Sequence, residues 1–160
     1  MTSKKRVVLI TGAESGIGKS TSKIFLDNGY KVICTYLKNN NNKNTKDIEY
    51  HRIDITKNKD WENLALHVKK KFKKIDVLVN SAGVRLSGNL ETTSMSDWSY
   101  HLNNNVTGTF LACKYILPFL KKAKNSSIIN VASINSIRGV KNMLASVSYT
   151  HLTLPTNDRV

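Results

Sequence analysis

Cysteine, proline and long apolar runs are all scarce in this 160-residue chain, and each shortage excludes a class of protein. The two cysteines, Cys34 and Cys113, lie inside apolar patterns, which argues against a disulfide framework and predicts a reducing, cytoplasmic location. No apolar run approaches the ~20 residues of a membrane-spanning helix, so we expect no membrane partner. The apolar stretch 7–10 is too short for the core of a signal peptide. The length suits one domain with a single core.

Acidic residues are also scarce, since 11 Asp and Glu stand against 25 Lys and Arg and give a net charge of +14. Such a charge is typical of nucleic-acid-binding proteins. Here, however, 20 Lys accompany only 5 Arg and 18 Asn, and Lys and Asn both have AT-rich codons. The basic residues are scattered, and no aromatic residues alternate with them as in a base-stacking surface. We therefore expect no nucleic-acid partner.

Apolar runs with the length of buried strands alternate with segments of helical spacing along the chain. This alternation predicts an α/β fold with a doubly wound, Rossmann-like parallel sheet in which the fifth expected strand is the last. Thr56 and Ser96 are predicted to cap two of the helices, and Ile17 and Ile24 have the spacing of an apolar face on the first helix. The expected strands are 7–11, 31–36, 50–55, 75–80 and 127–132.

A glycine-rich turn, residues 11–18, lies directly between the first strand and the first helix. Gly12 permits a tight turn, Gly16 allows close approach of the backbone to a phosphate, and Gly18 allows the helix to pack on the sheet. Exposed amides at the positive end of the helix would then receive a pyrophosphate. The turn therefore predicts a dinucleotide site.

The same turn also resembles a Walker A phosphate loop, written Ala13-x-x-x-x-Gly18-Lys19-Ser20. In that interpretation Lys19 would contact the β- and γ-phosphates and Ser20 would hold Mg²⁺. Such an enzyme needs an Asp at the end of a later apolar strand, but 127–132 ends in Ala-Ser and Asp76 lies near the start of its strand. A P-loop protein is thus the alternative, and we expect no metal site.

Two later segments fit a dinucleotide better than a nucleoside triphosphate. Asp54 is expected at the end of the third strand, where a carboxylate can accept a hydrogen bond from the adenine amino group. Asn80, Ala82 and Gly83 follow the fourth strand at the carboxyl edge of the sheet, where ligands of such folds bind.

Five motifs in order now resemble the short-chain dehydrogenase/reductase family over residues 5–145. They match its cofactor loop, its adenine-binding Asp, its Asn-Asn-Ala-Gly signature, the helix with its catalytic Asn and the strand before its catalytic Ser. In this chain they read Thr11-Gly12-Ala13-Glu14-Ser15-Gly16-Ile17-Gly18, Asp54, Asn80-Ser81-Ala82-Gly83, Asn105-Val106-Thr107-Gly108 and Ile128-Ile129-Asn130-Val131-Ala132-Ser133.

The resemblance implies an NAD(P)(H)-dependent oxidoreductase that interconverts a carbonyl and a secondary alcohol. A Tyr would donate a proton to the carbonyl oxygen, and a Lys four residues later would lower the pKa of that Tyr. Ser133 would hydrogen-bond the carbonyl oxygen, and Asn105 would anchor a water relay through its backbone. Ser15, Ile17 and Ile55 complete the residues that the resemblance places at the cofactor.

The end of the second strand bears on the choice of cofactor. An acidic residue there would accept from the ribose hydroxyls of NAD and repel a 2′-phosphate. The segment from Thr35 to Lys38 has no carboxylate and one cation, which favours NADP(H) over NAD(H). Ser15 argues against this choice, because many NADP-using relatives have a basic residue at that position.

A 3-oxoacyl thioester or another small carbonyl compound is the expected substrate, and the full-length form is expected to be a homo-oligomer. Residues 85–89 do not match the usual continuation of 3-oxoacyl reductases, which leaves the substrate open. A non-catalytic dinucleotide-binding partner protein on the same fold is the second alternative. An intact Tyr-x-x-x-Lys would separate the two.

That motif is missing from its expected place. In the family the Tyr follows the Ser by about thirteen residues, which from Ser133 is position 146, and position 146 holds Ser. Tyr149 is followed four residues later by Thr153 rather than by Lys. We therefore expect the chain as written to be inactive.

The composition also changes at this point, since 147–155 contains neither Lys nor Asn. The residues from 147 to 156 are what GTC TCT TAT ACA CAT CTG ACG CTG CCG ACG encodes, a string that resembles a transposase-based sequencing adapter. We predict that 1–145 is a partial NAD(P)-binding domain and that 146–160 is a non-native tail.

Overall fold

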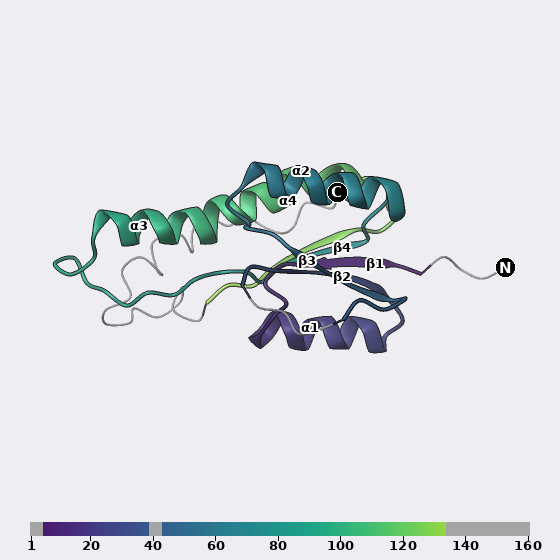
Figure 1. The fold of residues 1–160 in the computed structure, drawn as a ribbon, viewed down its shortest axis with the longest axis horizontal. Helices are drawn as coiled ribbons and strands as arrows, with labels where there is room; N and C mark the ends of the chain where they lie inside the picture. Colours follow the sequence, from purple (N-terminus) through teal and green to yellow (C-terminus); the bar gives the residue numbers. More distant parts are fainter. Residues whose placement is uncertain (1–4, 39–42, 134–160) are drawn as a thin grey trace.

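The computed structural model describes residues 5–38 and 43–133, which form a parallel sheet covered by helices on both faces (Figure 1). Predictions that fall on 146–160 therefore lie outside the described residues. Among the residues described, no helix combines the length and apolarity needed to cross a bilayer. The elements are β1 (Val7–Ile10), α1 (Gly16–Asp27), β2 (Lys31–Tyr36), β3 (Ile48–Arg52), α2 (Asn58–Lys71), β4 (Val77–Asn80), α3 (Met95–Leu102), the π-helical segment η1 (Asn103–Thr107), α4 (Gly108–Leu120) and β5 (Ser127–Asn130).

The strand order is β3-β2-β1-β4-β5, and every neighbouring pair is parallel. The central strand β1 is wholly apolar and buried, as expected for a strand that is covered on both faces. The order reverses beside β1, since β2 pairs on one side of it and β4 on the other. This confirms the doubly wound, Rossmann-like sheet predicted from the sequence, and loops that follow β1 and β4 meet at the switch point.

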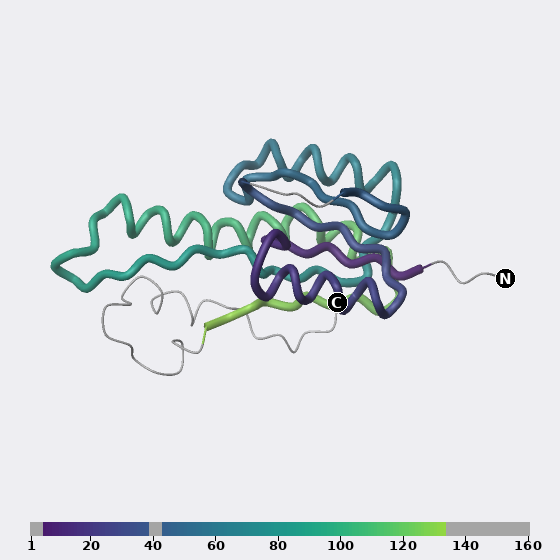
Figure 2. The backbone as a smooth tube through the Cα atoms, turned by 60° about the horizontal axis from the view of Figure 1, so that its bottom comes forward, coloured from purple at the N-terminus to yellow at the C-terminus, as the bar shows by residue number. Residues whose placement is uncertain are grey.

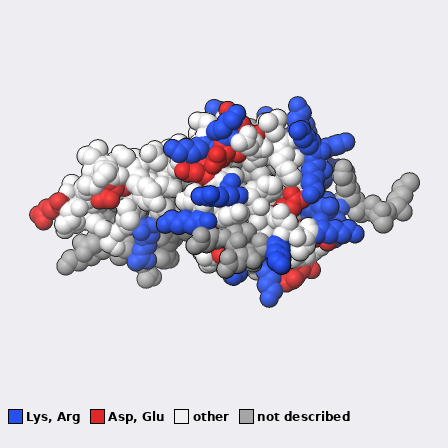
Figure 3. Space-filling view, in the orientation of Figure 1, with Lys and Arg blue, Asp and Glu red and all other residues white. Residues whose placement is uncertain are grey.

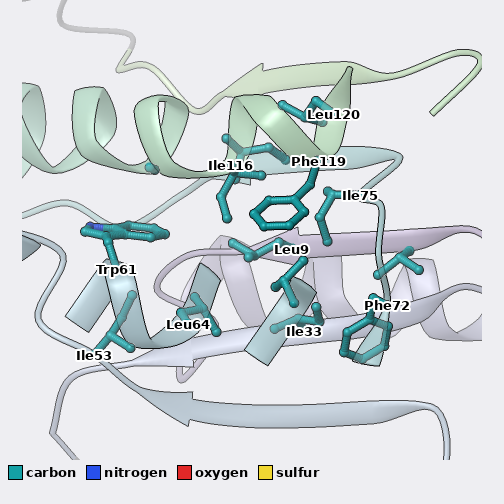
Figure 4. Packing of buried hydrophobic residues seen from close by; sticks show 14 of the residues in the cluster. Leu9, Ile33, Ile53, Trp61, Leu64, Phe72, Ile75, Ile116, Phe119 and Leu120 are labelled. Atoms are coloured by element: carbon teal, nitrogen blue, oxygen red, sulfur yellow. The ribbon is translucent and has the colours of Figure 1, made fainter. Parts of the chain in front are cut away.

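The larger core lies between the sheet and the pair α2 and α4 (Figure 4). Trp61 is fully buried there, and its indole N–H donates to the Ile55 carbonyl at 2.8 Å. Phe119 and Ile116 of α4 reach the same cluster as Leu9 of β1. On the other face, α1 covers a smaller core built from the alternate residues of β1, β2 and β4. The strands β1, β2 and β4 thus contribute apolar side chains to both faces.

A long helical stretch extends beyond the sheet. In Figures 1 and 2, α3 continues through η1 into α4, and only α4 packs over the strands. On the face shown in Figure 3, the basic side chains gather over the half that contains the sheet, and the α3 end carries few of them.

Several local predictions were wrong by about two residues. The third strand runs over Ile48–Arg52 rather than 50–55, so Asp54 lies two residues beyond it. Helix α2 is preceded by Lys57, which makes no side-chain cap bond, because the Thr56 hydroxyl donates to Asp54 instead. Helix α3 is capped by Ser94 rather than Ser96: the Ser94 hydroxyl oxygen accepts from the Asp97 N–H.

The apolar face predicted for the first helix is also wrong at Ile17 and Ile24, although Phe25 of the same helix packs against the smaller core. Ile17 and Ile24 are both 61% exposed, and the buried residues of α1 are Gly18 and Ser22. Small residues let α1 approach the sheet closely, which turns the two isoleucines outward.

Candidate functional site

A cleft of about 780 Å³ lies at the carboxyl ends of the strands, on the side of the sheet toward α3. Its walls come from the loops after β1, β2, β3 and β4 and from the helical stretch of α3 and η1. The structure brings most of the predicted cofactor residues together here. The lining residues are Gly12, Glu14, Ser15, Gly16, Ile17, Gly18, Thr35, Tyr36, Leu37, Lys38, Ile53, Ile55, Ser81, Ala82, Gly83, Val84, Tyr100 and Asn104.

The loop after β1 is held in place by its neighbours on both sides. The Thr11 hydroxyl oxygen accepts from the backbone N–H of Ser81 and of Ala82, both at 3.0 Å. On the other side, the Ala13 N–H donates to the Thr35 carbonyl at 2.9 Å. The loop is therefore anchored to the ends of both β4 and β2, which fixes its backbone facing the cleft.

Two of the three glycines in this loop allow close packing. A Cβ on Gly12 would stand 2.7 Å from the Cα of Ala82, and a Cβ on Gly18 would stand 2.3 Å from the carbonyl oxygen of Gly12. Neither distance is possible for a real side chain, so these positions require glycine.

Gly16 differs from the other two glycines, because a Cβ there would meet nothing within 4 Å. Its φ of +50° is a left-handed conformation that glycine adopts without strain. Gly16 is also the first residue of α1, and the preceding Ser15 makes no side-chain cap bond. Open space thus lies directly in front of the first N–H groups of α1, which suits an anionic ligand.

The structure does not support the Walker A interpretation of the same residues. Lys19 and Ser20 lie inside α1 and are exposed, and neither is among the residues that line the cleft. The Lys19 N–H donates to the Ser15 carbonyl at 3.1 Å as part of the helix. The helix begins three residues too early for a phosphate to sit against the amide of Lys19.

The end of β2 contributes the predicted residues Thr35 and Lys38 and adds Tyr36, which was not predicted. Thr35 is only 1% exposed, whereas Tyr36 is partly exposed and Lys38 is exposed in the cleft. The Leu37 N–H donates to Oε1 of Glu14 at 3.3 Å, which brings a carboxylate beside β2 from the loop after β1. The second oxygen of Glu14, Oε2, is buried without a hydrogen-bond partner. Glu14 and Lys38 thus lie in the same corner of the cleft, where the loop after β1 meets the end of β2. Only the pairing of these two strands reveals this proximity.

Asp54 has a structural role in the turn between β3 and α2. Its Oδ1 accepts from the N–H of Thr56 at 2.9 Å and from the Thr56 hydroxyl at 2.7 Å. Its own N–H donates to the Asp60 carboxylate at 2.7 Å. Asp54 is not a lining residue, and the cleft wall at this point consists of Ile53 and Ile55.

Asn80 also faces away from the cleft. It is 5% exposed, and its amide nitrogen donates to Oδ1 of Asn130 at 2.8 Å and to the Cys113 sulfur at 3.6 Å. Burial raises the pKa of the Cys113 thiol, and the hydrogen bond from Asn80 opposes that rise. Asn80 therefore ties β4 to β5 and α4, while Ala82 and Gly83 after it reach the cleft.

Asn105 fixes the next part of that loop from η1. Its Oδ1 accepts from the Val84 N–H at 2.8 Å, and its Nδ2 donates to the Val84 carbonyl at 3.0 Å. The side chain thus holds both polar groups of one peptide residue and positions Gly83 and Val84 in the cleft wall. Tyr100 of α3 and Asn104, the residue before Asn105, line the cleft directly, and the spacing of four between them was the signal that could have identified them.

Ser133 lies three residues beyond β5 and is partly buried. It is not among the lining residues of the described cleft. Positions 146 and 150, where the family resemblance places Tyr and Lys, lie outside the described residues.

This chain is similar in sequence to curated reductases. The 3-ketodihydrosphingosine reductase of Bacteroides thetaiotaomicron is 31% identical over 135 residues, which are 84% of this chain and 49% of that protein. The 3-oxoacyl-[acyl-carrier-protein] reductase of Thermotoga maritima is 33% identical over 142 residues, which are 84% of this chain and 58% of the relative. The chain thus spans about half the length of these curated relatives.

Solved structures agree with the fold. The aldohexose dehydrogenase of Thermoplasma acidophilum, in ligand-free form, matches with a TM-score of 0.86 and 30% identity over 93% of this chain and 57% of its own. A variant of ElxO with NADPH bound matches with a TM-score of 0.84 and 32% identity, over 92% of this chain and 63% of its own. The profile of the short chain dehydrogenase family matches residues 6–149. The chain belongs to the short-chain dehydrogenase family.

Proposed function

We propose that the protein from which this chain comes is an NADP(H)-dependent oxidoreductase that interconverts a carbonyl and a secondary alcohol. The observation that carries the proposal is the open position in front of α1. Gly16 leaves free space there, while Gly12 and Gly18 hold the surrounding backbone tightly packed. A pyrophosphate fits such a position because backbone N–H groups and the helix dipole both favour an anion.

The nicotinamide of this cofactor would supply or accept the hydride. The protein residues would orient it: the loop after β1 at the pyrophosphate, Ile53 and Ile55 along one wall and Gly83 with Val84 along the other. Apolar walls suit a flat ring and exclude water from the cleft. The cleft thus combines the polar backbone of the loop after β1 with two apolar walls. This combination supports a dinucleotide rather than a nucleoside triphosphate.

The end of β2 supports NADP(H) over NAD(H). The residues that line the cleft there are Thr35, Tyr36, Leu37 and Lys38, so this strand end offers a cation and no carboxylate. The relative ElxO binds NADPH. Glu14 introduces a negative charge into the same corner, and this charge opposes the binding of a 2′-phosphate.

For the chemistry at the carbonyl, we assign Ser133 as the hydrogen-bond donor to the substrate oxygen. Asn105 uses its side chain to hold Val84, and its backbone carbonyl accepts from the Thr109 hydroxyl at 2.9 Å. The water relay that the family resemblance implies would be anchored at this backbone. A Tyr and a Lys at positions 146 and 150 would complete the set, but these positions hold Ser and Thr. The 160-residue chain should therefore bind the cofactor without turnover.

The substrate class rests on the relatives. The names of two of them denote reduction of a 3-keto or 3-oxo compound. The substrate we propose is a 3-oxoacyl thioester or a related small carbonyl compound. We also propose that the full-length protein is a homo-oligomer. The second candidate is a protein that binds the dinucleotide without catalysis, and the missing Tyr-x-x-x-Lys is the feature in its favour.

Fluorescence titration of the purified chain with NADPH, NADH and Mg-ATP tests the ligand. We expect saturable enhancement of the nicotinamide fluorescence, with NADPH tighter than NADH and with no competition by Mg-ATP. Gly16→Ala should weaken NADPH binding at least tenfold, because the new methyl group occupies the pyrophosphate position. Lys19→Ala is the matched control three residues later, and it should leave binding unchanged.

Tight ATP binding that Lys19→Ala abolishes would overturn the proposal in favour of a P-loop protein. The choice between an enzyme and a binding protein needs the complete gene product, assayed for NADPH oxidation with a 3-oxoacyl thioester. Cofactor binding without turnover in that protein would support the non-catalytic candidate.

A further inference from the structure

Three potential metal ligands lie together between β3 and α2, away from the cleft. They are Glu49 and His51 of β3 and His67 of α2, and one ligand atom from each lies within 4.8 Å of the others. The Nε2 of His67 stands 2.7 Å from Oε2 of Glu49, and the Nε2 of His51 stands 3.3 Å from the same oxygen. The two imidazole rings are 4.6 Å apart between centroids.

The backbone places these groups together independently of any ligand. Glu49 and His51 are two residues apart on one strand, so their side chains point to the same face of the sheet. That face is the one covered by α2, and His67 projects toward it from the helix. The rigid sheet and helix thus hold the three donors, and no loop residue is involved.

The spacing is close to that of a bound zinc ion. Four ligands at about 2.1 Å in tetrahedral arrangement stand ~3.4 Å from one another, which small rotations of these side chains would reach. Two imidazole nitrogens and one carboxylate oxygen are a donor set that zinc favours, with water in the fourth position. The histidine side chains are 25% and 35% exposed, so both an ion and its water have access from solvent.

Glu49 is the least expected member of this group. It is 8% exposed, and a buried carboxylate needs compensation. Burial alone would raise the pKa of Glu49, but hydrogen bonds from Lys71, His67 and His51 together hold it below its usual value. Lys71 pairs with Oε1, whereas both histidines face Oε2. One oxygen of Glu49 is therefore held by the ammonium group, just as the carboxylate ligands of metal sites are commonly held by hydrogen bonds. The other oxygen is directed at the two histidines.

We propose that Glu49, His51 and His67 bind a divalent transition-metal ion, with zinc as the ion that the donor set fits best. The ion would replace the hydrogen bonds between these three side chains with bonds to itself. It would join the edge strand β3 to α2 across a sequence separation of 16 to 18 residues. Because the unfolded chain does not hold the three ligands together, metal binding would stabilise the folded state.

Calorimetric titration of the untagged chain with zinc chloride tests the proposal. We expect one zinc ion per chain and an increase in the melting temperature on adding zinc. His67→Gln and Glu49→Gln should each weaken binding by at least the ~10–100-fold that loss of an outer-shell partner costs a metal site. Glu62→Gln, on the exposed face of the same helix, and His151→Gln are the matched controls, and both should bind zinc like the unaltered chain.

A second measurement covers variants that fail to fold. In the unaltered chain, zinc should shift the imidazole NMR signals of His51 and His67 and leave that of His101 in place, because His101 is buried against the loop at Leu86. Absence of zinc binding, equal affinity in the folded His67→Gln variant, or shifts confined to other histidines would each overturn the proposal.

Discussion

One corner of the cleft contains two opposite charges, Glu14 from the loop after β1 and Lys38 from the segment after β2. The Glu14 carboxylate accepts from the Leu37 N–H, and Lys38 follows one residue later. A 2′-phosphate near this corner would be attracted by Lys38 and repelled by Glu14. Their balance should therefore determine the choice between the two cofactors.

Removing a negative charge from this corner and adding one should change cofactor selectivity in opposite directions. Glu14→Gln removes a negative charge and keeps an acceptor for the Leu37 N–H, so we expect the ratio of NADH to NADPH dissociation constants to rise severalfold. Tyr36→Asp adds a carboxylate at the partly exposed last residue of β2, so the ratio should fall. Fluorescence titration with both cofactors measures the change. Equal ratios in all three proteins would contradict this account of the corner.

Thr35 is the wrong position for the same experiment, although it also borders the cleft. Its side chain is buried at 1% exposure, so Thr35→Asp would place a carboxylate where water cannot solvate it. Loss of stability would then obscure any change of selectivity.

Cys34 should make the protein less stable at alkaline pH. Burial raises the pKa of its thiol to about 12 from 9.0, and a hydrogen bond with Ser22 only partly opposes this. Between these values the unfolded chain loses the thiol proton while the folded chain keeps it. Stability therefore decreases as pH rises from about 9 toward about 12.

Urea denaturation at pH 8 and pH 10.5 measures this effect. Cys34→Ala should show a smaller decrease in the free energy of unfolding between the two pH values than the unaltered chain. The lysines contribute equally to both proteins, whereas Tyr50, whose pKa is raised by burial and by the neighbouring Cys34, is coupled to the same thiol. The difference therefore reports Cys34 together with this coupling. Identical decreases would show that the thiol does not titrate differently on unfolding.

At the scale of elements, the π-helical segment η1 connects the long helix to the cleft wall. Its Asn105 holds the Val84 peptide groups, and the neighbouring Asn103 is exposed. Asn105→Ala removes both bonds, and we expect it to lower the free energy of unfolding by about 1–3 kcal/mol. The Val84 amide should also exchange with solvent much faster. Asn103→Ala is the matched control, and it should change neither quantity; unchanged exchange in Asn105→Ala would contradict the role of η1.

The sequence predicted the elements better than their ends. Every expected strand is present because apolar runs bounded by glycine or polar residues leave little choice of structure. The third strand was misplaced because it begins at Ile48, while apolar Ile53 and Ile55, which were assigned to it, follow it in the cleft wall. Ser94 and Ser96 have the same capping chemistry, and only the backbone geometry distinguishes them.

The candidate site was predictable to the extent that its residues follow one another along the chain. The glycines of the loop after β1 were found from spacing, and Ala82 and Gly83 from their place after an apolar run. Glu14 was missed because its effect depends on β2 lying next to β1, which single-sequence patterns do not specify. The pairing of Asn105 with Val84 depends in the same way on tertiary packing.

At the scale of the molecule, the origin of residues 146–160 can be tested directly. We propose that they are not part of the natural protein, because Ser146 stands where the family has Tyr. Amplification of the source locus beyond the Ala145 codon should recover a Tyr codon at 146 and a Lys codon at 150 in the same frame. Finding codons for Thr150 to Pro155 in genomic DNA would refute the proposal.

The sheet order also determines when each side of the protein can close during synthesis. The core under α1 draws its buried residues from Val8 to Val79, so it can form once β4 has left the ribosome. The core under α2 also contains Phe119 and Leu120 of α4, so the strand faces on this side stay uncovered until these residues have been synthesised. At ordinary translation rates this interval lasts roughly 2–8 s. During this time Leu9, Ile33 and Leu78 would face solvent. A nascent chain at this stage has one packed side and one exposed apolar side that a chaperone would bind.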